Sequence, residues 1–176
     1  MFRKLMDDLY EKEGGFVNHK ADKGGATKYG ITKRTLAEWR DNPVTEEDVL
    51  ILTKTEAEAI YMAWYYKRPQ IDKLPEVLQP FMFDACVNHG AKQAWKFMQL
   101  ALNNLLPAYL EVDGIPGKKT FAAIEKIANG DDLIKELVRQ REIFYAALVT
   151  AKPSQKVFLK GWMARAKSFL KNTITK

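Results

Sequence analysis

Two acidic residues near the start of the chain have the side chains that glycosidic bond cleavage requires. Glu13 stands before Gly14-Gly15, and Asp22 follows in a glycine-rich segment. Hydrolysis of a glycosidic bond needs a carboxylic acid that protonates the leaving oxygen. It usually also needs a second carboxylate that stabilises the oxocarbenium ion or positions water. The spacing alone leaves a second interpretation open, because Asp22 is also a good turn residue.

A helix is predicted to position the first of these acids. Apolar residues recur with helical spacing at Phe2, Leu5, Met6 and Leu9, and Glu13 continues the same face. Burial and the negative end of the helix both disfavour a charged carboxylate, so the pKa of Glu13 should be raised, as a general acid requires. The alternative is a solvated helix-end residue followed by a glycine C-cap.

The second acid stands in a segment without helical periodicity, between Phe16 and Thr32. β-forming residues near both ends of this segment predict a small hairpin or an irregular β-lobe. Thr27 and Tyr29 lie in the same segment, and we expect both to face a groove together with Asp22.

The rest of the chain reads as helical, so the predicted fold is mainly α (α+β). Thr32, Thr45 and Thr53 are expected helix caps, the last opening a helix to about Arg68. Further helices are predicted over about 77–89, 91–106, 117–129, 131–149 and 155–171. The Pro- and Gly-rich residues 107–117 form the one candidate boundary. We therefore expect a lobe over 1–106 and a helical region over 107–176, packed as one compact unit.

Basic residues are concentrated at the C-terminus. The net charge is +6, and residues 152–176 hold seven Lys and Arg and no acid, which leaves 21 basic and 22 acidic residues elsewhere. This end suits a polyanion such as a nucleic acid, an anionic membrane or an acidic wall polymer. The helix over 155–171 could act on membranes. Its broad aromatic face favours packing on the domain, with lysines exposed.

Several other functions are excluded by composition. A single cysteine, Cys86, allows no intramolecular disulfide, and two histidines, His19 and His89, are too few for a zinc site. The run Gly114–Thr120 lacks the glycine spacing and the Lys-Ser/Thr pair of a phosphate-binding loop. No secretory signal or membrane span is predicted. We expect no metal and no cofactor.

Three motifs, in order along the chain, resemble known sequences. Residues 13–18 (EGGFVN) with 22–32 (DKGGATKYGIT), and later 83–90 (FDACVNHG), resemble the N-acetylmuramidases of glycoside hydrolase family 108. Residues 112–120 (VDGIPGKKT) are similar to a motif of the helical peptidoglycan-binding region that often follows. One departure is Lys23, where the family often has proline, which could alter how Asp22 is held.

The resemblance implies a lysozyme-like fold and cleavage between N-acetylmuramic acid and N-acetylglucosamine. Glu13 matches the catalytic acid of the family, and Asp22 and Thr27 match the residue types that follow it in lysozyme-like phage enzymes. Tyr29 is expected to shape a sugar subsite. Asp84 and Asn88 share one face of the central helix and either bind sugar groups or tie neighbouring loops together.

The expected protein is a monomeric phage endolysin that binds peptidoglycan and no nucleic acid. It would be made in the host cytoplasm and would reach the periplasm and cell wall with the help of a holin. Two alternatives remain open: a lytic transglycosylase that uses the same Glu13, and a non-catalytic wall- or nucleic-acid-binding module driven by the basic tail.

Overall fold

The computed structural model describes residues 1–13, 27–107, 109–127 and 129–173, and it divides into two units, Met1–Arg68 and Pro69–Lys176. The division differs from the boundary at 106/107 predicted from the sequence. The difference arises because the helix over 91–105 packs closely against the helix over 130–151, so the segments on either side of 106/107 belong to the same unit.

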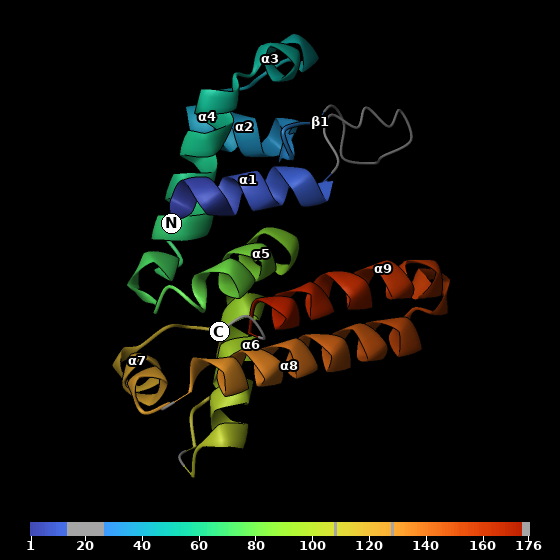
Figure 1. Ribbon diagram of the computed structural model, residues 1–176. Helices are drawn as coiled ribbons and strands as arrows, with labels where there is room; N and C mark the ends of the chain where they lie inside the picture. Colours follow the sequence, from blue (N-terminus) through green and yellow to red (C-terminus); the bar gives the residue numbers. More distant parts are fainter. Residues whose placement is uncertain (14–26, 108, 128, 174–176) are drawn as a thin grey trace. The chain divides into compact units, whose positions relative to one another are not determined.

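The first unit begins with α1 (Phe2–Glu13), shown in blue in Figure 1. Its predicted apolar stripe is confirmed, since Leu5, Met6 and Leu9 are buried. Glu13 is the last helical residue of α1, as expected.

A short hairpin precedes the second helix of this unit. β1 (Thr27–Lys28) pairs antiparallel with β2 (Ile31–Thr32), with Thr27 opposite Thr32. The two connecting residues, Tyr29 and Gly30, have positive φ angles of 53° and 75°. Two such residues in a two-residue loop indicate a type I′ turn, whose twist matches that of the strands. The predicted hairpin is therefore present over its described part.

The three predicted threonine caps are confirmed. Thr32, Thr45 and Thr53 begin α2 (Lys33–Arg40), α3 (Glu46–Ile51) and α4 (Lys54–Ile60), and each hydroxyl accepts a hydrogen bond from a backbone N–H three residues later. The segment after α4 continues to Lys67 as a π-helix, η1 (Tyr61–Lys67), where the sequence predicted an ordinary α-helix. The wider hydrogen-bonding pattern of a π-helix is often found at functional sites.

The second unit is built from helices. They are η2 (Ile71–Lys73), α5 (Gln79–His89), α6 (Ala91–Leu105), α7 (Lys118–Glu125), α8 (Gly130–Ala151), η3 (Pro153–Gln155), α9 (Lys156–Lys167) and η4 (Ser168–Thr173). α6 packs on α5 and α8, and α9 returns along α8 (Figure 1). The predicted central helix is confirmed as α5, because Phe81, Met82 and Phe83 on it are buried.

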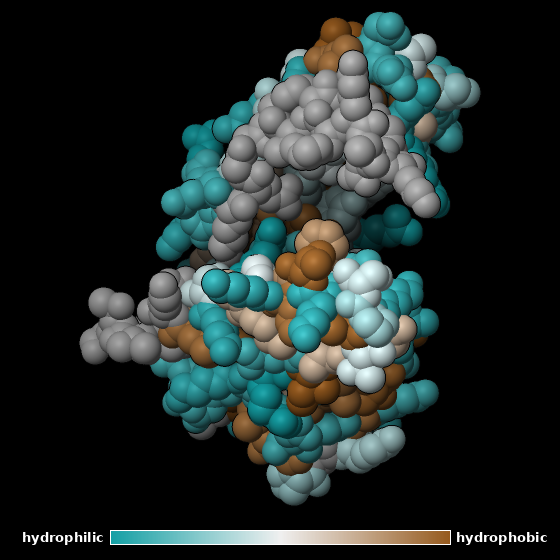
Figure 2. Space-filling view, turned by 90° about the vertical axis from the view of Figure 1, so that its right-hand side faces the viewer, coloured by the Kyte–Doolittle hydropathy of each residue, from teal (hydrophilic) through white to brown (hydrophobic). Residues whose placement is uncertain are grey.

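The predicted packing of the C-terminal helix on the domain is also confirmed. Ala166 in α9 and Phe169 in η4 are buried, and both elements contact α8. The first turn of α9 is open, since Val157 and Phe158 are 79% and 54% exposed. On the face of this unit that Figure 2 shows, apolar residues interleave with hydrophilic ones. Within the described ranges, no helix has the length and apolarity needed to cross a bilayer.

Candidate functional site

The end of α1 carries the predicted catalytic acid. The helical backbone extends to Glu13, so this residue stands where the partial negative charge of the helix dipole lies. Gly14, Gly15 and Asp22 lie outside the described residues. Of the three residues predicted to do chemistry, the structure thus gives backbone positions for Glu13 and Thr27.

Tyr29 occupies a strained position that contacts from two helical elements maintain. A positive φ is unusual for a bulky residue and costs free energy unless the surroundings hold it. The Tyr61 hydroxyl from η1 donates to the Tyr29 carbonyl oxygen at 3.1 Å. The Tyr29 ring meets the Tyr10 ring of α1 edge-on, with centroids 6.1 Å apart. These contacts fasten the hairpin turn to α1 and η1.

Tyr10 is a candidate site residue that the sequence reasoning missed. Its hydroxyl oxygen is buried and has no hydrogen-bond partner among the described residues. Burial, followed by the nearby acids and Tyr29, raises the pKa of Tyr10 to about 12, so the phenol stays protonated near neutral pH. Tyr10 precedes Glu13 by three residues and therefore lies on the same helix face. That spacing was the available signal, and it makes Tyr10 a candidate donor near the end of α1.

Asp84, a predicted substrate-binding residue, lies in a buried ion cluster. Its carboxylate accepts from Arg141 Nη1 at 2.7 Å and from Arg165 Nε at 3.0 Å, and the residue is 4% exposed. These bonds join α5 to α8 and α9, which favours the alternative that Asp84 ties elements together. Asn88 is exposed on α5, and its side-chain amide donates to the Asp84 backbone carbonyl at 2.7 Å.

His89 belongs to the same cluster and is held neutral by it. Its Nε2 accepts from Arg141 Nε at 3.1 Å and lies 3.1 Å from the Tyr145 hydroxyl. Burial, followed by the positive charge of Arg141, lowers the pKa of His89 to about 4. Among the described residues, no three or more His, Cys, Asp or Glu side chains group in a way that could hold a metal ion.

The third sequence motif, residues 112–120, forms a tight turn that side chains of α6 hold in place. Gly114 has a φ of 77°, and a Cβ atom there would collide with the Lys92 carbonyl oxygen, so only glycine fits. Gln99 donates to Asp113 Oδ1 at 2.7 Å and accepts from the Gly114 N–H at 2.8 Å. One helical turn later, Asn103 forms two such bonds with the backbone of Leu110.

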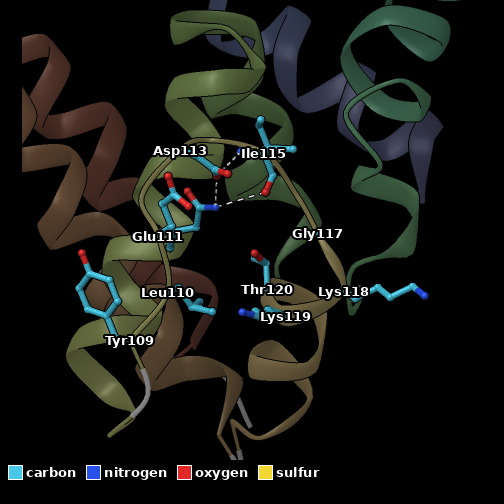
Figure 3. A pocket seen from close by; sticks show the side chains of 10 residues that line it. Tyr109, Leu110, Glu111, Asp113, Ile115, Gly117, Lys118, Lys119 and Thr120 are labelled. Atoms are coloured by element: carbon cyan, nitrogen blue, oxygen red, sulfur yellow. Dashed lines mark hydrogen bonds between the residues drawn. The ribbon is translucent and has the colours of Figure 1, made fainter.

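The loop that α6 holds in place, together with the start of α7, lines a pocket of about 450 Å³, which Figure 3 shows from close by. The lining residues are Gln99, Tyr109, Leu110, Glu111, Asp113, Ile115, Gly117, Lys118, Lys119 and Thr120. The volume falls in the range of small-molecule sites, roughly 300–1,000 Å³. The motif therefore builds a concave surface in addition to a helix start.

Comparisons with known proteins agree with the order of these motifs. The family model for glycosyl hydrolase 108 matches residues 6–90, and the model described as a predicted peptidoglycan domain matches residues 93–167. A solved structure of SagA from Brucella abortus has 33% sequence identity and a TM-score of 0.80, covering 97% of this chain and 92% of that chain. No curated protein in the search matches the chain.

The chain therefore belongs to the glycosyl hydrolase 108 family and carries a peptidoglycan-binding domain in its C-terminal part. The resemblance drawn from the sequence motifs is confirmed, as is the mainly α, lysozyme-like fold with one small hairpin and a helical C-terminal region. This family assignment supports a glycoside hydrolase that acts on peptidoglycan.

Proposed function

We propose that the protein is a muramidase that hydrolyses the β-1,4 bond between N-acetylmuramic acid and N-acetylglucosamine. The observation that carries this proposal is the position of Glu13. It ends α1 inside the segment matched by the hydrolase family, and the Tyr29 turn is fastened to the same helix through Tyr10. A carboxyl at the negative end of a helix favours its protonated form, which is the form a general acid needs.

In the proposed reaction, Glu13 donates its proton to the glycosidic oxygen as that oxygen leaves the muramic acid C1. Asp22 stabilises the developing oxocarbenium ion or, with Thr27, holds the water that attacks C1. The water gives its hydroxyl to the sugar and its second proton to a carboxylate. Tyr29 shapes a sugar subsite, and the unpartnered Tyr10 hydroxyl is an additional donor beside it.

The biological setting follows as part of the same proposal. A phage endolysin would be made in the host cytoplasm, leave it through a holin and act as a monomer on the cell wall. The excess of Lys and Arg over residues 152–176 would aid adhesion to the anionic wall.

Product analysis of digested peptidoglycan tests the proposal. Glu13→Gln should lower the rate of reducing-end release by about 10²–10⁴-fold, the usual contribution of a general acid, while the circular dichroism spectrum stays unchanged. Glu11→Gln, an exposed acid on the same helix, is the matched control and should retain activity. Asp22→Asn should be less severe than Glu13→Gln.

Three outcomes would overturn the proposal or redirect it. Wild-type lysis by Glu13→Gln would remove the acid from the mechanism. Products ending in 1,6-anhydromuramic acid would identify a lytic transglycosylase, in which the substrate's own 6-hydroxyl replaces water. A biological effect that survives in Glu13→Gln but disappears when residues 152–176 are neutralised would identify a non-catalytic binding module.

A further inference from the structure

The pocket beside α7 has two walls of opposite charge. Figure 3 shows Glu111 and Asp113 on the loop at one side, and Lys119 and Thr120 on α7 at the other. In the same view, the side chain of Lys119 extends toward the pocket, whereas that of Lys118 extends away from it. A ligand that carries separate positive and negative groups would satisfy both walls.

The acidic wall includes the carboxylate of Asp113, which stays ionised. Hydrogen bonds from the Gln99 amide and from the Ile115 N–H lower the pKa of Asp113, so its carboxylate is ionised at neutral pH. Asp113 Oδ1 accepts both of these bonds. Gln99 is only 2% exposed, so a buried side chain fixes the orientation of the carboxylate. Such a fixed carboxylate suits an ammonium group.

The basic wall combines a lysine with the start of a helix. α7 is eight residues long, and its N-cap, Gly117, supplies no side chain to its first N–H groups. These donors and the positive end of the helix dipole favour a carboxylate ligand. The Lys119 ammonium adds a full charge at the same wall.

Thr120 adds a hydroxyl to the wall of the pocket. The residue is 4% exposed, and Figure 3 shows its hydroxyl directed into the pocket. The hydroxyl is not one of the buried side-chain atoms without a partner, so solvent in the pocket can reach it. A hydroxyl in this position can donate to or accept from a polar group of a ligand.

We propose that this pocket binds the peptide stem of peptidoglycan, through the ammonium and carboxylate groups at the stem's end. The inference rests on the proposed function only in taking peptidoglycan as the ligand. The sugar strand is a poor match for the pocket because the lactyl carboxylate of muramic acid is consumed in the amide bond to the stem. A stem ending in amino acids with free carboxylates and a diamino acid offers both charges. Exposed Tyr109, at 89%, and Ile115, at 64%, supply apolar contact at the rim.

The test measures binding of two probes to the full chain carrying Glu13→Gln, so that no glycan is cleaved. One probe is the free tetrapeptide L-Ala-D-Glu-meso-diaminopimelate-D-Ala, and the other is a tetramer of N-acetylglucosamine, which has no peptide. The tetrapeptide should bind, and adding Lys119→Met should weaken it by about tenfold, as expected for loss of one charge-assisted contact.

Two further variants make the result specific. Lys126→Met, an exposed lysine after the last residue of α7 that does not line the pocket, should change tetrapeptide affinity less than about twofold, since exposed charges contribute little. Thr120→Val keeps the shape and removes the hydroxyl, and it should weaken the tetrapeptide by several-fold. Neither Lys119→Met nor Thr120→Val should alter binding of the sugar tetramer, and both should keep the wild-type circular dichroism spectrum.

The proposal is overturned if the tetrapeptide does not bind, or if Lys126→Met and Lys119→Met weaken its binding equally. It is also overturned if Lys119→Met weakens the sugar tetramer instead, which would make the pocket a glycan site. These results do not depend on whether wild-type protein cleaves peptidoglycan, so failure of the muramidase proposal and failure of this one are distinguishable.

Discussion

One buried polar side chain in each unit can be compared, because the two differ in their bonding. In Met1–Arg68, the Tyr10 hydroxyl is buried beside the end of α1 with no described partner. In Pro69–Lys176, the Asp84 carboxylate is equally hidden but is bonded by two guanidinium groups. A bonded buried charge holds elements together, whereas an unbonded buried donor costs free energy, as at Tyr10 and at Arg141 Nη2 in the second unit. Its two ion pairs give Asp84 a structural role, whereas Tyr10 near the end of α1 is a candidate for contact with a ligand.

Asp84→Asn gives the largest expected effect and tests the stability half of this comparison. The substitution leaves Arg141 and Arg165 as uncompensated charges, so the free energy of unfolding should fall by about 3–5 kcal/mol in urea denaturation. Asp132→Asn, which breaks an exposed pair with Lys135, should cost less than about 1 kcal/mol. If Asp84→Asn instead lowered activity at unchanged stability, the residue would contact substrate, as the sequence analysis also allowed.

Acidification should weaken the same cluster to a smaller extent through His89. The pKa of His89 is about 4 in the folded protein and near 6.5 in the unfolded chain. Below about pH 6.5, the unfolded chain therefore binds a proton at His89 that the folded protein does not bind. The contribution is full above the unfolded pKa and is lost progressively as the pH falls toward 4. Charged or titratable neighbours that face the imidazole are Arg141, Arg165, Asp84 and Tyr145.

Urea denaturation at pH 7 and pH 5 of wild type and His89→Gln isolates this effect, because both proteins share all other titrating groups. Wild type should lose more stability between the two pH values than His89→Gln does. Equal losses would show that His89 is protonated in the folded state at pH 5.

Tyr10→Phe should give the smallest change in stability and a change of opposite sign. Removing an unbonded buried hydroxyl relieves its desolvation cost, so stability should stay constant or rise by up to about 1 kcal/mol. Activity on peptidoglycan should fall if the Tyr10 hydroxyl donates to the substrate, because that donor is lost. A clear loss of stability with unchanged activity would place Tyr10 with Asp84 as a structural residue and remove the contrast between the two units.

Much of the fold was predictable because its signals are local. The spacing of Leu5, Met6 and Leu9 predicted α1, and three threonines predicted three helix starts, since a cap needs only the residues of one helical turn. The π-helix at Tyr61–Lys67 was not predicted, because the sequence of a π-helix resembles that of an α-helix and its hydrogen-bonding shift depends on packing.

The candidate site was predictable to a smaller extent. The type of Glu13 and its place at a helix end follow from the sequence, as do the Thr27 to Thr32 hairpin and the motif that contains Gly114. The roles of Glu13, Asp22 and Thr27 remain predictions. Which polar residues are bonded to one another could not be derived, because Asp84 meets Arg141 and Arg165 across 57 and 81 residues of sequence.

The sequence by itself determined the helices, their caps, the hairpin and the family motifs, because periodicity, turn chemistry and short motifs are properties of neighbouring residues. Only the tertiary structure decided that Asp84 is neutralised in the interior, that the buried Tyr10 hydroxyl has no described partner, and that Glu111 and Lys119 line one pocket. Burial and charge pairing depend on which distant segments come together, and no local pattern specifies that.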